Sequence, residues 1–219
     1  RYDGVARCSR TFARDGAALV MLSNLGPGVV RGDRLELTGT VCGGAHLIVT
    51  EQTATRVLGG SAPSTFAANW TVEPGATLDL RAEPVVAHHR GEHEIVTEID
   101  CAPDACVILR DLASVAGDAR LRLRTLVRVD GRDRFYDALE LGAAAPPAVG
   151  TFVVIGRALA PEPFDALAQA ATDVRIGIGT LPEGLFARVL GPAVWPVSEA
   201  LAALRATFSS AATTVLASR

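Results

Sequence analysis

The chain contains no lysine, so its 21 basic residues are all arginine, against 24 acidic residues. The formal net charge of -3 gives no reason to expect binding to nucleic acid. Arginine suits surfaces that bind carboxylates, but a GC-rich coding bias produces the same composition and is the favoured explanation. The basic residues alone therefore identify no partner.

Cysteine and aromatic residues are scarce. None of the four cysteines forms a C-x-x-C pair, and a 219-residue chain with 49% hydrophobic residues can build its core without disulfides. We therefore expect reduced thiols in a cytoplasmic protein. No signal-peptide pattern opens the chain and no long apolar stretch predicts a membrane span. An aromatic content of 5% argues against the exposed aromatic ladder of a carbohydrate-binding β-solenoid.

Common catalytic motifs are also missing from the sequence. The glycines at 59 and 60 are not followed by the Lys-Ser/Thr pair of a phosphate-binding loop. The glycine-rich segment 26–32 lies between expected strands, without the helix that a dinucleotide site needs. No G-x-S-x-G nucleophile elbow occurs. The sequence therefore gives no support for any of these three kinds of site.

Alternation of apolar and polar residues predicts β-strands at 34–41, 45–52 and 120–129, because successive strand side chains point to opposite faces. Helical spacing predicts a helix over 164–171, opened by Pro161 and Pro163. A second helix is expected from about Ser198, as its N-cap, with one face formed by Leu201, Leu204, Phe208 and Val215. The prediction is one domain over residues 1–219, mainly β, with two α-helices.

A short pattern recurs in the first half of the chain. Residues 41–47 (VCGGAHL) resemble 72–78 (VEPGATL), and 100–107 (DCAPDACV) is a weaker third copy. The copies follow one another at intervals of about 30 residues, which is typical of stacked architectures. Each copy reads as a hairpin of strand, tight turn and strand. The alternative is a chance similarity between ordinary hairpin turns.

Three of the four histidines lie in 88–94 (HHRGEHE). Imidazole and carboxylate groups bind nickel or zinc, but this spacing is not an H-E-x-x-H or zinc-finger pattern. A solvated polar turn is the favoured interpretation. Transient metal contacts through His88, His89 and His93 are the alternative, and a metal-dependent hydrolase at the same three residues is the alternative function.

Four arginines, Arg120, Arg122, Arg124 and Arg128, fall on one face of the strand expected at 120–129. A solvated sheet face is the favoured interpretation. A docking surface for an acidic partner is the alternative.

Two segments carry a resemblance to a known family. Residues 24–35 (NLGPGVVRGDRL) and 50–57 (TEQTATRV) are similar, in order and spacing, to the NPGGGLVGGDxL and TTQAATKV stretches of the UreD (UreH) family of urease accessory proteins. Weaker similarity follows at 82–84 and 181–191. The resemblance implies stacked, β-helix-like layers. It also implies a scaffold without catalytic activity, in complex with a UreF-type protein, a UreG-type GTPase and the urease apoprotein.

The resemblance further implies that nickel passes through a polar internal tunnel as cargo, with no permanently bound cofactor. By position, Thr50 and Gln52 match the family's tunnel-associated Thr-x-Gln, and Asp33 matches the aspartate of its Gly-Asp turn. Alternatively, Asp33 only fixes a turn, and Thr50 and Gln52 only satisfy backbone groups. We expect Glu51 on the same polar path as Asp33, Thr50 and Gln52, although it departs from the family pattern. It shares a strand face with Val49, where a buried carboxylate is costly unless it is paired.

Overall fold

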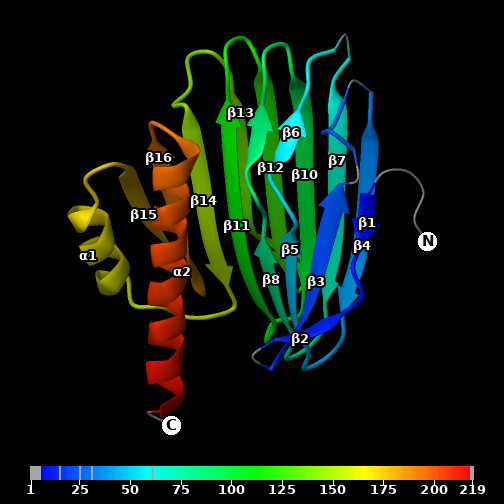
Figure 1. Ribbon diagram of the computed structural model, residues 1–219. Coiled ribbons are helices and arrows are strands. Elements are labelled where there is room, and N and C mark those ends of the chain that lie inside the picture. Colours follow the sequence, from blue (N-terminus) through cyan, green and yellow to red (C-terminus); the bar gives the residue numbers. More distant parts are fainter. Residues whose placement is uncertain (1–5, 15, 25, 31, 61, 218–219) are drawn as a thin grey trace.

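A computed structural model describes residues 6–14, 16–24, 26–30, 32–60 and 62–217. Its strands form two sheets that face each other, and both helices lie on the outer side of one sheet (Figure 1). The larger sheet, called sheet A, has eleven strands with β1-β3-β5-β8-β11-β14-β16-β15 as its main path. The smaller, sheet B, has the order β13-β12-β10-β7-β4. The expected mainly β fold with stacked strands and two helices is confirmed.

The elements follow one another along the chain with short connections. Sheet A contains β1 (Ala6–Cys8), β2 (Phe12–Arg14), β3 (Ala17–Asn24), β5 (His46–Glu51), β6 (Thr55–Val57), β8 (Thr77–Arg81), β9 (Val85–Ala87), β11 (Cys106–Val115), β14 (Ala148–Ile155), β15 (Arg175–Leu181) and β16 (Gly184–Gly191). Sheet B contains β4 (Arg34–Val41), β7 (Ser64–Val72), β10 (Glu92–Cys101), β12 (Arg120–Val129) and β13 (Arg132–Leu141). The helices are α1 (Glu162–Ala170) and α2 (Val194–Ala217).

The sequence repeat corresponds to three stacked arches. Strands β4, β7 and β10 are parallel neighbours in sheet B, and the strands that follow them, β5, β8 and β11, are parallel neighbours in sheet A. The prediction of a stacked repeat is confirmed. The prediction of hairpins is wrong, because each turn carries the chain from one sheet to the other instead of back along the same sheet.

The three turns of the arches share one hydrogen bond. In each, the alanine of the repeat donates its N–H to the carbonyl oxygen three residues earlier: Ala45 at 2.9 Å, Ala76 at 3.1 Å and Ala105 at 3.1 Å. The first two alanines also bond to the next arch. The N–H of Thr77 donates to the carbonyl oxygen of Ala45, and the N–H of Cys106 donates to that of Ala76. The alanines are 2% exposed or less in the second and third copies, where no larger side chain has room.

Three apolar clusters hold the layers together. One fills the space between the sheets around Leu78, Val107 and Val127, and another lies further along the same space around Val57, Leu121 and Val149. The third packs α1 and α2 onto the outer face of sheet A, with Phe164 and Leu201 at its centre. Sheet A is therefore covered on both faces at β11, β14 and β16. In β5, Ile48 and Val49 are both buried, so this strand lacks the predicted alternation.

The helices are close to their predicted positions. Helix α1 begins after Pro161, with Pro163 in its first turn, as predicted. Helix α2 begins at Val194, so the prediction of Ser198 as N-cap is wrong. Pro196 falls in the first turn, where backbone N–H groups have no intrahelical partner, and it therefore does not stop the helix. The side chain of Val215 lies outside the described part of the molecule.

Two further expectations concern the whole chain. The four cysteines, all within the described ranges, are free thiols, and Cys101 and Cys106 are buried. Among the described residues, no helix combines the length and the apolar character needed to cross a membrane.

Candidate functional site

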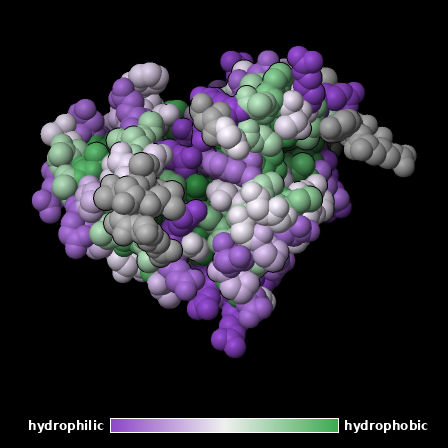
Figure 2. Space-filling view, turned by 90° about the horizontal axis from the view of Figure 1, so that it is seen from below, coloured by the Kyte–Doolittle hydropathy of each residue, from purple (hydrophilic) through white to green (hydrophobic). Residues whose placement is uncertain are grey.

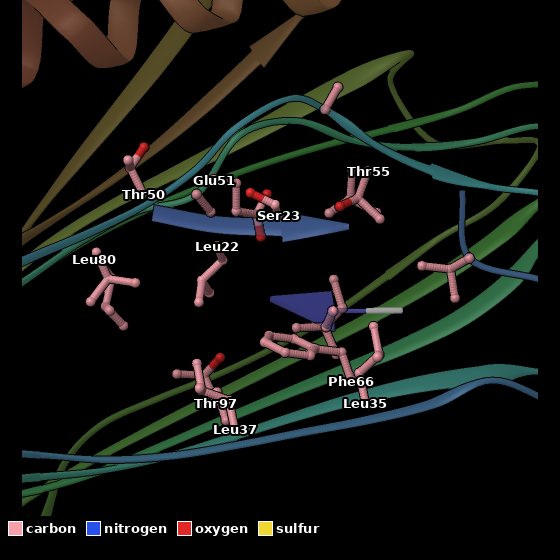
Figure 3. Close-up of a pocket in the computed structure, with 18 of the residues that line it drawn as sticks. Leu22, Ser23, Leu35, Leu37, Thr50, Glu51, Thr55, Phe66, Leu80 and Thr97 are labelled. Atoms are coloured by element: carbon pink, nitrogen blue, oxygen red, sulfur yellow. The ribbon is translucent and has the colours of Figure 1, made fainter. Parts of the chain in front are cut away.

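A cavity of about 750 Å³ lies between the two sheets, beside the strands at the start of the chain. Its walls come from β1, β3, β5 and β8 of sheet A and from β4, β7 and β10 of sheet B. Much of the wall is apolar, including Leu22, Leu35, Leu37 and Phe66, and Figure 3 shows these side chains together with Glu51 and Thr97 around the space. The cavity forms where the sheets approach their β1 and β4 edges, so that the sandwich is open on this side.

Besides the exposed Glu36 of β4, two less exposed carboxyl groups line this cavity, those of Glu51 and Asp111. Glu51 ends β5 on the inward face, and one of its oxygens, Oε2, is enclosed without a hydrogen-bond partner. Burial raises the pKa of Glu51 to about 7, although the N–H of Glu83 acts in the opposite direction. Burial also raises the pKa of Asp111, on β11, to about 6, and the nearby Asp137 adds to this effect. Both side chains keep partial exposure because they face the cavity.

Asp111 belongs to a buried polar layer that crosses the interior of the sandwich, and Glu51 interacts with Asp111 from the cavity side. In sheet B, Thr97, Thr125 and Asp137 are direct register neighbours. In sheet A, Asp111 is the neighbour of Thr151, which is the neighbour of Arg188. The residues two positions before and after each member on the same strand face are apolar and belong to, or pack against, the two clusters between the sheets. The polar layer therefore separates one apolar cluster from the other.

The two ends of the polar layer differ. At the cavity end, the Glu51 and Asp111 carboxyls have no ion pair of 4.0 Å or less within the described part of the chain. At the far end, Arg188 donates to Asp137 at 2.6 Å and to the Thr151 hydroxyl at 3.0 Å. An incoming cation therefore meets two free carboxyls first and a closed ion pair last.

The structure brings one of the four predicted tunnel residues into the cavity with an inward-pointing side chain, and this is Glu51. Thr50 points to the opposite face of β5, as Ile48 does, and its hydroxyl donates to the Arg81 carbonyl oxygen at the border of the cavity. Gln52 lies just after β5 and is exposed. Asp33 fixes a turn, because its Oδ2 accepts the N–H of Val30 at 2.9 Å.

The glycine-rich segment 24–35 nevertheless contributes to the cavity. Gly26, Pro27, Gly28 and Val29 line it, and a Cβ on Gly28 would lie 2.5 Å from the carbonyl oxygen of Arg56. Residues 25 and 31 of the motif lie outside the described part of the chain. The segment thus passes close to the 50–57 segment, so both stretches of the family resemblance meet at the cavity.

The histidines of 88–94 are separated by the fold. His88 and His89 are exposed in the turn before β10, and His89 Nδ1 lies 2.6 Å from Asp118. His93 is 4% exposed and faces inward. Within the described ranges, no group of three or more His, Cys, Asp or Glu side chains is placed to hold a metal ion. The structure therefore does not assemble the three-histidine site of the hydrolase alternative.

The arginine face of β12 is the outer face of sheet B, as predicted. Arg122 pairs with Glu140, Arg124 with Glu94, and Arg128 with three acidic residues at 3.0 to 3.4 Å. These arginines are largely matched by carboxylates of the neighbouring strands. The solvated-face interpretation therefore agrees with the structure better than an acidic docking surface does.

Asp111 and Thr97 were not identified from the sequence. The signal was present, because Asp111 interrupts the apolar inward set formed by Val107, Leu109 and Ala113 on the same strand. A polar residue at such a position is informative, since buried polar groups need a partner or a function.

Nearly the whole chain matches one family model. The model of the family described as UreD urease accessory protein matches residues 1–218. The chain belongs to the UreD family of urease accessory proteins. Proteins named urease accessory protein UreD are 35% identical in Frankia casuarinae over 52% of this chain, 28% in Alkalilimnicola ehrlichii over 92% and 28% in Streptomyces coelicolor over 93%. The matches span 37%, 76% and 83% of those relatives, respectively, so the first covers only about a third of its length.

Proposed function

We propose that this UreD-family chain acts in the maturation of urease as a scaffold through which nickel passes, without catalytic activity of its own. The observation that carries the proposal is the cavity between the sheets, with the unpaired carboxyls of Glu51 and Asp111 in its wall. Family membership supports the role in urease maturation.

The chemistry of the cavity suits a divalent ion in transit. Ni²⁺ binds carboxylate oxygens and imidazole nitrogens, and an ion that must leave again needs weak, successive contacts more than a closed cage. An approaching cation favours the ionised form of Glu51 and Asp111, so it displaces their protons as it binds. The threonine hydroxyls of the polar layer extend this oxygen-lined route towards Asp137.

The partners in this proposal are a UreF-type helical protein, a UreG-type GTPase that supplies nickel, and the urease apoprotein that receives it in the cytoplasm. No observation favours the hydrolase alternative, because His88 and His89 lie outside the cavity that His93 faces. Co-purification of the tagged chain with the helical protein, the GTPase and urease tests the partners.

Co-expression of the urease genes with Asp111→Asn and Glu51→Gln tests the route. The expected result is a several-fold lower nickel content of the purified urease, with the complex still assembled. Glu199→Gln is the matched control, since Glu199 is exposed on α2 and does not line the cavity. Unchanged nickel content in both cavity variants would refute passage through this cavity.

A further inference from the structure

One buried histidine in the cavity wall has an unusual hydrogen-bonding arrangement. His93 lies on the inward face of β10, four residues before Thr97, and is 4% exposed. Its Nδ1 is 2.9 Å from the hydroxyl oxygen of Ser64 on the neighbouring strand β7. That hydroxyl donates its own hydrogen to the carbonyl oxygen of Glu92 at 3.2 Å. The hydroxyl has no second hydrogen, so the ring must donate Nδ1–H to Ser64.

This arrangement leaves the other ring nitrogen, Nε2, with a free lone pair. Within the described part of the chain, Nε2 has no protein hydrogen-bond partner, and it is not sealed off as Nε2 of His46 is. Because His93 also lines the cavity, the lone pair is reachable from that space. Burial lowers the pKa of His93, which keeps the ring neutral and suited to bind a metal.

A core histidine with a purely structural role would use both nitrogens within the protein, since a buried unpaired acceptor is costly. Here one nitrogen is fixed by a side chain that lies behind the ring, and the other is offered to the cavity. Histidines that bind metals show this pattern, in which a partner on the second nitrogen sets the tautomer and the orientation of the ring.

We propose that His93 is a nickel contact in the cavity wall, binding the ion through Nε2 while Ser64 holds the ring in the tautomer that leaves this nitrogen free. The inference rests on the proposed function, because it requires nickel to enter the cavity. A single imidazole makes a weak site, unlike the three or four protein ligands of a stable metal centre. His93 therefore serves as one weak contact in the cavity wall, which the ion can leave again.

The binding test uses the full chain labelled with ¹⁵N, NiCl₂ as the probe, and histidine ring spectra. Before nickel is added, His93 is expected to show a protonated Nδ1 and an unprotonated Nε2. Nickel is then expected to broaden the His93 signals in a His88→Ala, His89→Ala variant as strongly as in the parent. A protonated Nε2, or broadening confined to His88 and His89, would overturn the inference.

Two variants separate binding from folding. His93→Gln removes the imidazole. Ser64→Ala keeps the imidazole but removes the hydroxyl that fixes its orientation. Ser64→Ala is expected to weaken nickel binding at His93 about tenfold, as losses of such supporting residues do. Because Ser64→Ala retains the imidazole, it still tests the inference if His93→Gln fails to fold. Equal nickel affinity in the Ser64→Ala variant and the parent would overturn the orienting role.

The cellular readout distinguishes this inference from the proposed function. With the urease genes co-expressed at limiting nickel, His93→Gln is expected to lower the nickel content of urease, as Asp111→Asn does. If Asp111→Asn lowers it and His93→Gln does not, the His93 contact is refuted and the proposed function stands. If neither variant lowers it, both fail.

Discussion

The raised pKa of Glu51 makes a quantitative prediction about stability. The pKa of Glu51 rises from 4.5 in an ordinary environment to about 7 in the folded protein. At about 1.4 kcal/mol per pKa unit, the ionised carboxylate destabilises the folded state by about 3 kcal/mol. Replacement by Gln keeps the shape and removes the charge. Glu51→Gln is therefore expected to be more stable than the parent at alkaline pH, although it is expected to transfer less nickel.

The pH dependence fixes the sign of this effect. Below the ordinary pKa of 4.5, both the folded and the unfolded chain hold the proton, so the carboxyl costs nothing. Between 4.5 and about 7 the unfolded chain releases the proton while the folded chain keeps it, and the free energy of unfolding falls. Above about 7 the full penalty applies. The difference between Glu51→Gln and the parent should therefore grow from about zero near pH 4 to about 3 kcal/mol near pH 8.

Urea denaturation of the parent and of Glu51→Gln across this pH range measures the difference in the free energy of unfolding. For Asp111→Asn, the same gain in stability over the parent is expected to develop between pH 3.8 and about 6. Glu199→Gln, at an exposed position of α2 outside the cavity, is the control and should show no such trend. A stability gain that is absent at alkaline pH, or that is equal at every pH, would refute the assignment of Glu51 as a buried, unpaired carboxyl.

Three further variants test the packing by urea denaturation. A Cβ at Gly39 would lie 2.2 Å from the Trp70 ring, so Gly39→Val should cost about 1–3 kcal/mol and shift the tryptophan fluorescence; an unchanged spectrum would contradict this contact. Arg205→Met removes a 2.6 Å ion pair from Asp79, which is 1% exposed, so a cost of about 2 kcal/mol is expected, and a neutral effect would show that α2 is held by apolar contacts alone. Leu78→Ala, at a site that is 0% exposed, should cost about 2–5 kcal/mol; less than 1 kcal/mol would mean that the neighbouring cavity collapses to fill the space.

Much of the architecture was predictable from local patterns. The alternation at 34–41 and 120–129 gave strands with one inward face, and the recurring alanine turn gave stacked coils. Whether the chain turns back within a sheet or crosses to the opposite one was not predictable, because both arrangements use the same short turn and the same alternation. The choice depends on contacts between strands that are about 30 residues apart.

The site was predictable only in part, for a related reason. Period two correctly separated Thr50 from Glu51, but which face of β5 borders a cavity depends on the opposite sheet. Resemblance to the family favoured Thr50 and Gln52, whereas the structure directs the inward carboxyl of Glu51 at the space. Asp111 joins it from a strand that lies far away in the sequence.

The stacking of the arches also determines which part of the cavity wall loosens first. In a solenoid each coil is held by its immediate neighbours, so an end coil is held from one side. In the described part of the chain, β4 pairs with β7 alone, whereas β7 and β10 each pair on both sides. Fraying of β4 would withdraw Leu35 and Leu37 from the wall without disturbing the polar layer behind them. Opening of the cavity therefore depends on the local detachment of one terminal strand. The free energy of that local opening is well below the free energy of unfolding the whole protein.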